Sequence, residues 1–243
     1  MLQRIDVSDR VSLEPSPRLV VARFRDDTIV RRALELLAEA AGEEPRWRAT
    51  IEKRIPIAAG LGGGSSDAAT ALRLANETLE RPLPPAQLLD LASRLGADVP
   101  FFLVPGPQLG VGDGSDLTPL DLPQDYWVLL VLPSGARKES TAAVYAAFDE
   151  RAGADGFVDR RRALLDVIGR VRRPRDLAAL PRNDLASSPL TDELLALEAF
   201  RADVSGAGPA VYGLFVHERD VRAAARRLER RGDVWITVPT WYV

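Results

Sequence analysis

The apolar positions in the first half of the chain change between a strand period and a helix period. Residues 49–55 alternate apolar with polar side chains, as a half-buried strand does, and residues 2–13 and 18–24 are two further predicted strands. The predicted helices are, in chain order, Thr28–Ala41, a helix carrying Ala68, Leu72, Ala75 and Leu79, and Ala86–Leu95, which ends at Gly96. The first half is therefore predicted to be a mixed unit of helices and strands.

A continuous apolar run over Tyr126–Leu132 predicts a buried strand at the start of the second half. An arginine-rich helical region follows from about Glu139 to Leu180, so we place the domain boundary near Pro133, with domains 1–133 and 134–243. The remaining predicted elements are a helix opened by Ser187-Ser188-Pro189, strands 203–205 and 210–216, a helix through Val221, Ala224, Ala225 and Leu228, and a strand over Val234–Val238. This order predicts an open antiparallel sheet backed by helices, of ferredoxin-like type, and places the chain in the α+β class.

Composition and charge narrow the classes of function. The 243 residues have a formal net charge of −3 and their arginines are interleaved with acids, which gives no basic face for nucleic acid. There is no cysteine, so disulfides and thiolate metal sites are excluded. Since there is neither a signal-peptide core nor an apolar run of membrane-spanning length, we expect a cytoplasmic protein without a membrane partner. His217, the only histidine, lies in a polar stretch and is predicted at the surface, which disfavours Ser-His-Asp and His-metal mechanisms.

A glycine-rich loop between a predicted strand and a predicted helix is the strongest functional signal. Its residues are Pro56, Ile57, Ala58, Ala59, Gly60, Leu61, Gly62, Gly63, Gly64, Ser65 and Ser66. Glycines permit positive φ angles and a close approach of backbone N–H groups to an anion, and the following helix adds unpaired N–H donors and the positive end of its dipole. An isolated glycine run is more often a turn or a linker, but the flanking strand and helix, with Ser65, Ser66 and Asp67 as predicted cap residues, favour a phosphate site. A P-loop NTPase and a Rossmann dehydrogenase are disfavoured, because no lysine follows the glycines and their spacing does not match G-x-G-x-x-G.

Two further segments carry candidate chemistry. Asp98 is an acid in apolar surroundings directly after a predicted helix end, and its role is either to cap the next turn or to accept the proton of an attacking hydroxyl. The loop Gly206-Ala207-Gly208 is either a plain hairpin turn or, if it faces the first glycine loop, a place where substrate or phosphate passes close to the backbone. Asn183-Asp184 precedes a predicted helix, where a cap is the expected role.

Four segments together resemble the 4-diphosphocytidyl-2-C-methyl-D-erythritol kinases, which belong to the GHMP superfamily of galactokinase, homoserine kinase and mevalonate kinase. The segments are IEKRIPIAAGLGGGSSDAATALRLAN, LGADVPFFL, NDL at residues 183–185, and SGAGPAVYGLF from Ser205. GLGGGSSDAA and LGADVPFF are specific to this family, whereas SGAGP is shared with homoserine kinase.

The resemblance implies ATP-dependent phosphorylation of the 2-hydroxyl of a cytidine-diphosphate-linked methylerythritol in non-mevalonate isoprenoid synthesis. It also implies a two-domain fold, with a ribosomal-S5-domain-2-like N-terminal domain and a ferredoxin-like C-terminal domain. By the same resemblance Pro56–Ser66 cradles the ATP phosphates, Asp98 is the catalytic base, Ser66 helps to hold Mg²⁺, and Gly206 and Gly208 line the substrate cleft. We expect a monomer or a homodimer that acts on a small molecule.

The start of the sequence departs from the family pattern. The family has a Pro-Ala-Lys-x-Asn-Leu strand, whose lysine lies beside the catalytic aspartate, and an Asp-Gly-Tyr-His turn, whose histidine contacts cytosine. Residues 1–50 contain neither lysine nor histidine, and Thr28 stands where the family often has asparagine. We therefore expect either a natural chain that begins further upstream or a shortened paralogue, since loss of one preorganised charge costs on the order of 10²-fold in rate. The alternative functions are a nucleotide-binding pseudokinase and another GHMP kinase such as homoserine kinase.

Overall fold

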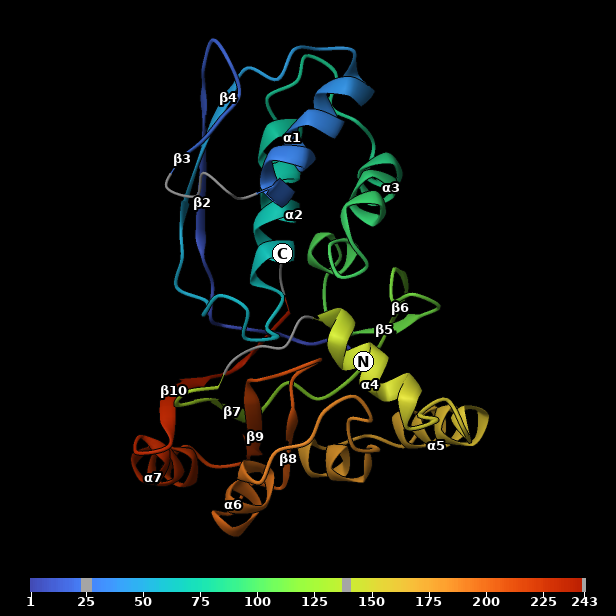
Figure 1. The fold of residues 1–243 in the computed structure, drawn as a ribbon, viewed down its shortest axis with the longest axis vertical. Coiled ribbons are helices and arrows are strands. Elements are labelled where there is room, and N and C mark those ends of the chain that lie inside the picture. The colour runs from blue at the N-terminus through green and yellow to red at the C-terminus, as the bar shows by residue number, and fades with distance from the viewer. Residues whose placement is uncertain (23–27, 137–140, 242–243) are drawn as a thin grey trace. The chain divides into compact units, whose positions relative to one another are not determined.

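The computed structural model describes residues 1–22, 28–136 and 141–241, and the chain forms two compact units (Figure 1). Unit 1 comprises Met1–Ile57, Gly62–Leu120 and Trp241–Val243, and unit 2 comprises Ala58–Leu61 and Asp121–Thr240. The predicted domain boundary near Pro133 therefore moves to Leu120 and Asp121. The reason is that the strand ending at Pro133 is hydrogen-bonded to other strands of unit 2.

Unit 1 contains a three-stranded sheet. Its central strand β4 (Trp47–Glu52) pairs antiparallel with β2 (Arg10–Pro15) and parallel with β3 (Val20–Ala22). Alternate β4 side chains are buried, namely those of Trp47, Ala49 and Ile51, as the sequence pattern predicts. The three expected strand regions are present, but the one predicted over residues 2–13 is divided into β1 (Arg4–Ile5) and β2, and the one predicted over residues 49–55 ends at Glu52. Residues 23 and 24 of the second predicted strand lie outside the described residues.

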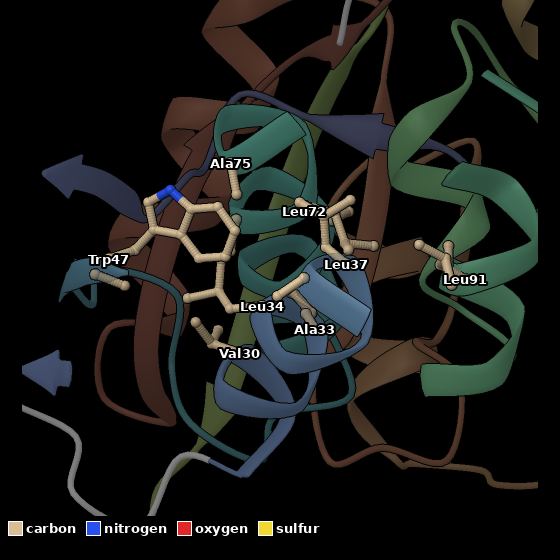
Figure 2. Close-up of a cluster of buried hydrophobic side chains, with 14 of the residues drawn as sticks. Val30, Ala33, Leu34, Leu37, Trp47, Leu72, Ala75 and Leu91 are labelled. Carbon is tan, nitrogen blue, oxygen red and sulfur yellow. The ribbon is translucent and has the colours of Figure 1, made fainter. Parts of the chain in front are cut away.

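Three helices supply most of the core of unit 1, two of them against this sheet and the third against the other two helices. They are α1 (Thr28–Ala41), which has the predicted bounds, α2 (Gly63–Asn76) and α3 (Pro85–Leu95). Figure 1 shows α1 and α2 side by side against the sheet. Figure 2 shows Leu34 next to Trp47, Leu37 and Leu72 beside each other, and Leu91 on the α3 side of the same cluster. Each such burial contributes about 1.5–3 kcal/mol. Helix α3 ends at Gly96 as predicted, but Gly96 has a φ of 166°, so it is extended and not left-handed.

Shorter elements complete unit 1. They are β1 (Arg4–Ile5), the 3₁₀ helix η1 (Pro100–Leu103) and a hairpin of β5 (Gln108–Val111) and β6 (Asp116–Pro119). The Arg4 side chain donates a hydrogen bond from Nη2 to the Phe101 carbonyl at 2.7 Å. This bond attaches the first residues of the chain to η1.

Unit 2 is built on a four-stranded antiparallel sheet with the order β10-β7-β9-β8. The strands are β7 (Trp127–Pro133), β8 (Arg201–Val204), β9 (Val211–Phe215) and β10 (Gly232–Thr237), and the short strand β11 is Pro239–Thr240. The helices are α4 (Thr141–Glu150), α5 (Phe157–Ile168), η2 (Pro174–Ala179), α6 (Leu190–Ala196) and α7 (Glu218–Leu228). The ferredoxin-like sheet predicted from the element order is confirmed, while Glu139, where the helical region was predicted to start, lies outside the described residues.

The amphipathic pattern of α7 shows how the second core forms. Its buried residues are Val221, Ala224, Ala225 and Leu228, and they pack on the sheet. His217 is exposed directly before this helix, as predicted. Across the described ranges, no helix has both the length and the apolar character needed to cross a membrane.

Candidate active site

The backbone of the glycine-rich loop has left-handed φ angles at every second residue. Ala58, Gly60 and Gly62 have φ values of 59°, 77° and 68°. Helix α2 begins directly afterwards, and its first hydrogen bond runs from the Ser66 N–H to the Gly62 carbonyl at 2.9 Å. The N–H groups of residues 63–65 precede that bond and so have no intrahelical acceptor. Free N–H donors at the positive end of a helix dipole form an anion-binding position.

The predicted cap chemistry of this helix is wrong. Ser65, Ser66 and Asp67 lie inside α2, and the N-cap is Gly62, which makes no side-chain hydrogen bond. A serine or aspartate cap would occupy the N–H groups of the first turn with its own oxygen. A glycine cap leaves them available to a ligand.

Close packing explains why side chains are absent from the start of α2. A Cβ atom on Gly62 would lie 3.0 Å from Cζ of Phe102, and one on Gly63 would lie 3.1 Å from Cγ2 of Ile55 and 3.2 Å from Nζ of Lys53. The first turn of α2 therefore rests directly on η1 and on the chain segment that follows β4. These glycines hold the helix start in a fixed place, unlike those of a flexible linker.

A buried charge cluster, formed by Asp9, Lys53 and Asp67, lies beneath this helix start. Lys53 Nζ donates to Asp67 Oδ2 at 2.8 Å and also to Asp9 Oδ2. Asp9 Oδ1 in turn accepts from the backbone N–H groups of Arg54 and Ile55, the latter at 2.8 Å. Both carboxylates have only 2% of their side-chain surface exposed. Asp9 thus connects the start of β2 to the segment on which Gly63 rests.

The three groups of the charge cluster have shifted pKa values. Burial raises the pKa of Asp67 to about 6, and the hydrogen bond and charge of Lys53 only partly oppose this. For Asp9, burial acts in the same direction, but the bonds from Lys53, Arg54 and Ile55 outweigh it and lower the pKa. For Lys53, burial is likewise outweighed by its two carboxylate partners, which raise the pKa.

Asp67→Asn is expected to change how stability depends on pH. Because the pKa of Asp67 rises from 3.8 to about 6 on folding, the native state binds this proton more tightly than the unfolded chain does. The stabilisation that protonated Asp67 gives the folded protein is complete below 3.8, the pKa in the unfolded chain. It is lost as the pH rises through about 6, the pKa in the folded protein. In urea titrations, the stability advantage of the parent over Asp67→Asn should shrink as the pH rises from about 4 to about 6, the interval between the two pKa values. A pH-independent difference, equal to that given by the exposed control Asp121→Asn, would contradict the assignment.

Asp98 lies in the turn between α3 and η1 and is exposed, whereas the adjacent Val99 is fully buried. Helix η1 has no side-chain cap, so the structure does not support the capping alternative for Asp98. Phe102, from the same helix, contacts Gly62. Asp98 therefore lies in the turn directly before η1, and η1 packs against the start of α2.

In unit 2, the loop containing Gly206 and Gly208 forms the hairpin between β8 and β9, and it faces residues 58–61 of the glycine-rich loop. Ser205 Oγ donates to the Gly60 carbonyl at 2.9 Å, and the Ala210 N–H donates to the Ala59 carbonyl at 3.0 Å. Gly206 and Gly208 have φ values of 55° and 75°. Residues 58–61 of the first glycine loop therefore contact the Gly206–Gly208 loop within unit 2, as the second alternative for that loop requires.

Comparisons with known proteins identify the fold and the family of this chain. The GHMP kinases N terminal domain matches residues 28–106, and the GHMP kinases C terminal domain matches residues 179–234. A crystal structure of mevalonate kinase has a TM-score of 0.78 at 15% identity and covers 99% of this chain and 92% of that one, which supports the fold alone. The fold and the two matched domains are those of a GHMP kinase.

Relatives of higher identity define the family within this class. A 4-diphosphocytidyl-2-C-methyl-D-erythritol kinase of Geotalea daltonii is 35% identical, covering 97% of this chain and 87% of the relative. The enzyme of the same name from Symbiobacterium thermophilum is 34% identical over 96% and 87%. A crystal structure of 4-(cytidine 5'-diphospho)-2C-methyl-D-erythritol kinase has a TM-score of 0.77 at 30% identity, covering 97% and 87%. The chain belongs to the 4-diphosphocytidyl-2-C-methyl-D-erythritol kinase family.

The positions of Asp9 and Lys53 in the charge cluster were not predicted from the sequence. A signal was present, because the antiparallel register pairs Arg10 with Glu52 and so places Asp9 opposite Lys53. Opposite charges at facing ends of two predicted strands indicate an ion pair once the pairing is known. The pairing itself does not follow from the local pattern.

Proposed function

We propose that this chain transfers the γ-phosphoryl group of ATP to the 2-hydroxyl of 4-diphosphocytidyl-2-C-methyl-D-erythritol. The observation that carries the proposal is the glycine-capped start of α2, whose N–H groups have no intrahelical acceptor, in a chain of this kinase family. A triphosphate supplies the anionic oxygens that such a backbone site binds.

The roles of the residues follow from their chemistry. The backbone of residues 56–66 binds the ATP phosphates, and Asp98 accepts the proton of the acceptor hydroxyl. The hydroxyl oxygen forms a bond to the γ-phosphorus as the bond from that phosphorus to the leaving ADP oxygen breaks. Gly206 and Gly208 offer backbone to the substrate, because neither residue has a side chain to block its approach.

The described residues offer few oxygen ligands for a Mg²⁺ ion. No cluster of three or more His, Asp or Glu side chains able to hold a metal is found in the described parts of the chain. Mg²⁺ in kinases is held largely by substrate phosphates and water, with one or two protein oxygens. Ser66, partly exposed in the first turn of α2, would supply a hydroxyl, and the ion would neutralise charge on the phosphates.

The setting of the reaction is proposed on the same grounds. The net charge of −3 supports a small-molecule enzyme without a nucleic-acid partner. We place it in the cytoplasm as a monomer or a homodimer.

The test is ATP consumption coupled to formation of a phosphorylated product, with the cytidyl substrate, homoserine and mevalonate as competing acceptors. Turnover that depends on the cytidyl substrate is expected. Turnover only with another alcohol would assign a different GHMP kinase activity. ATP binding without transfer to any acceptor would assign the pseudokinase alternative.

Gly60→Ala is expected to weaken ATP binding by about tenfold or more, a loss of at least one hydrogen bond's worth of free energy. A Cβ atom at this position would lie 2.6 Å from the Gly208 carbonyl oxygen and 2.7 Å from that of Ser205, so the loop must move. The matched control is Gly42→Ala, where φ is +69° but nothing lies within 4 Å of the added atom. Isothermal titration calorimetry with ATP measures both variants. Equal affinities in the two would show that the position of the Gly60 loop does not matter for ATP binding.

A further inference from the structure

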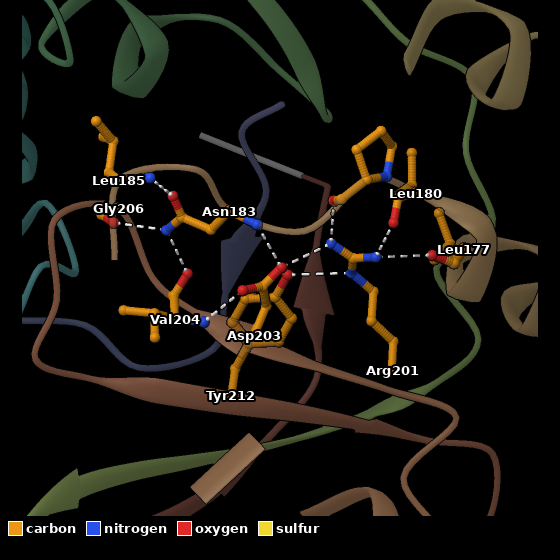
Figure 3. A network of polar contacts seen from close by, with 10 residues as sticks. Leu177, Leu180, Asn183, Leu185, Arg201, Asp203, Val204, Gly206 and Tyr212 are labelled. Atoms are coloured by element: carbon orange, nitrogen blue, oxygen red, sulfur yellow. Dashed lines mark hydrogen bonds and ion pairs between the residues drawn. The ribbon is translucent and has the colours of Figure 1, made fainter. Parts of the chain in front are cut away.

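The side chain of Asn183 makes three hydrogen bonds within unit 2 (Figure 3). Its Nδ2 donates to the carbonyls of Val204 at 3.0 Å and Gly206 at 2.7 Å, and its Oδ1 accepts from the Leu185 N–H at 2.8 Å. The bond to Leu185 closes a local turn. The predicted cap role of Asn183 is wrong, because the next helix, α6, begins at Leu190 and has Pro189 as its N-cap. The two donor bonds reach the end of β8 and the hairpin loop that follows it.

A buried ion pair holds the segment that carries Asn183. The Asn183 N–H donates to Asp203 Oδ2 at 2.9 Å, and the same oxygen accepts from Arg201 Nη2 at 3.0 Å. Arg201 also donates to the carbonyls of Leu180 at 2.6 Å and Pro181 at 2.8 Å. Arg201 and Asp203 are 8% and 4% exposed. Figure 3 shows this network joining the Leu180–Asn183 segment to β8, so Asn183 is presented to the hairpin from a rigid base.

The hairpin in turn sets the direction of two peptide groups in the glycine-rich loop. It donates to the carbonyls of Ala59 and Gly60, through Ala210 N–H and Ser205 Oγ respectively. In a planar trans peptide the C=O and the following N–H point in opposite directions. With both carbonyls turned to the hairpin, the N–H groups of Gly60 and Leu61 point away from it. Neither N–H donates to any acceptor among the described residues.

We infer that Asn183 is a positioning residue for nucleotide binding. It holds the Ser205–Ala210 hairpin in the shape that turns the Gly60 and Leu61 N–H groups toward the phosphates. This inference rests on the proposed function, since it assumes that the loop binds ATP. It gives Asn183 of the NDL segment a role in the kinase reaction in place of the predicted helix cap.

Asn183→Asp tests this inference because the change is isosteric. It keeps an acceptor for the Leu185 N–H but replaces the donor to Val204 and Gly206 by an oxygen that faces two carbonyl oxygens. The neutral variant Asn183→Ala shows whether the added charge is the cause. The matched control is Asn76→Asp, because Asn76 makes the same kind of donor and acceptor pair with Leu83 in unit 1, with no contact to the hairpin.

Two measurements are made on the full chain. In the nucleotide-free protein, hydrogen exchange at the amides of Ser205, Gly208 and Ala210 should rise about tenfold in both Asn183 variants and stay unchanged in Asn76→Asp, because one net hydrogen bond is worth about a factor of ten. The Kd for ATP, from calorimetry without acceptor, should rise by about tenfold for the Asn183 variants, and the KM for ATP should rise with it while kcat changes little.

The outcomes separate the inference from the proposed function. Unchanged exchange at the hairpin, or an unchanged Kd with faster exchange, would overturn the role of Asn183 while leaving the kinase proposal intact. If the parent chain binds no ATP, the proposed function fails and the nucleotide role fails with it, whereas the exchange data still show whether Asn183 holds the hairpin.

Should the Asn183 variants not fold, Ser205→Ala removes only the bond to Gly60. It is then expected to raise the Kd about fivefold, and a parent-like Kd would refute the inference.

Discussion

Asp98→Asn is expected to lower kcat by about 10³-fold, within the range of 10²–10⁴ for loss of a general base, with little change in ATP affinity. The carboxylate is exposed in a turn held by the buried Val99, so an amide of the same shape preserves the fold and removes only the proton acceptor. The measurement is steady-state transfer to the cytidyl substrate, together with the Kd for ATP. A loss of kcat at unchanged Kd identifies a group that acts in the transition state.

The matched control for this variant is Asp90→Asn. Asp90 is also exposed and lies on α3 in the same unit. It should retain the parental kcat. If Asp98→Asn and Asp90→Asn have the same activity, Asp98 is not the base and the proton leaves by another route.

Lys53→Met is expected to lower the free energy of unfolding by about 3–5 kcal/mol, the cost of removing one partner from a buried ion pair. Two carboxylates that are 2% exposed would then lie together without a counter-charge beneath the start of α2. Protonation relieves this repulsion, so the destabilisation should be larger at about pH 8 than at about pH 5. Urea denaturation of the parent and the variant at both pH values measures it.

Two further variants show whether burial causes the effect. Arg222→Met removes an exposed partner of Glu218 on α7, at 2.6 Å, and should cost no more than about 0.5 kcal/mol. Lys53→Met combined with Asp67→Asn should cost less than the sum of the two single changes, because the second change removes the carboxylate left unpaired by the first. Additive losses, or similar losses from Lys53→Met and Arg222→Met, would refute a coupled buried cluster.

Much of the fold was predictable because its elements are amphipathic over several turns. Helix α1 has the predicted bounds Thr28–Ala41, and the order of elements after Tyr126 predicted the ferredoxin-like sheet. The domain boundary was not predictable from composition. Strand β7 is an apolar run that either unit could bury, and its pairing with β9 and β10 assigns it to unit 2.

The candidate site likewise has one part that the sequence predicts and another part that depends on the tertiary structure. From the sequence alone, the segment from Pro56 to Ser66 could be predicted to bind an anion through its backbone, because that prediction depends on glycines followed by a helix within one short stretch. Tertiary structure alone decided that Lys53 lies between Asp9 and Asp67, and that Asn183 reaches the hairpin opposite Gly60. These partners are far apart along the chain, and their contact depends on strand register and on the course of the backbone between them. Local periodicity carries no information about either, since it reports only which face of each element is buried.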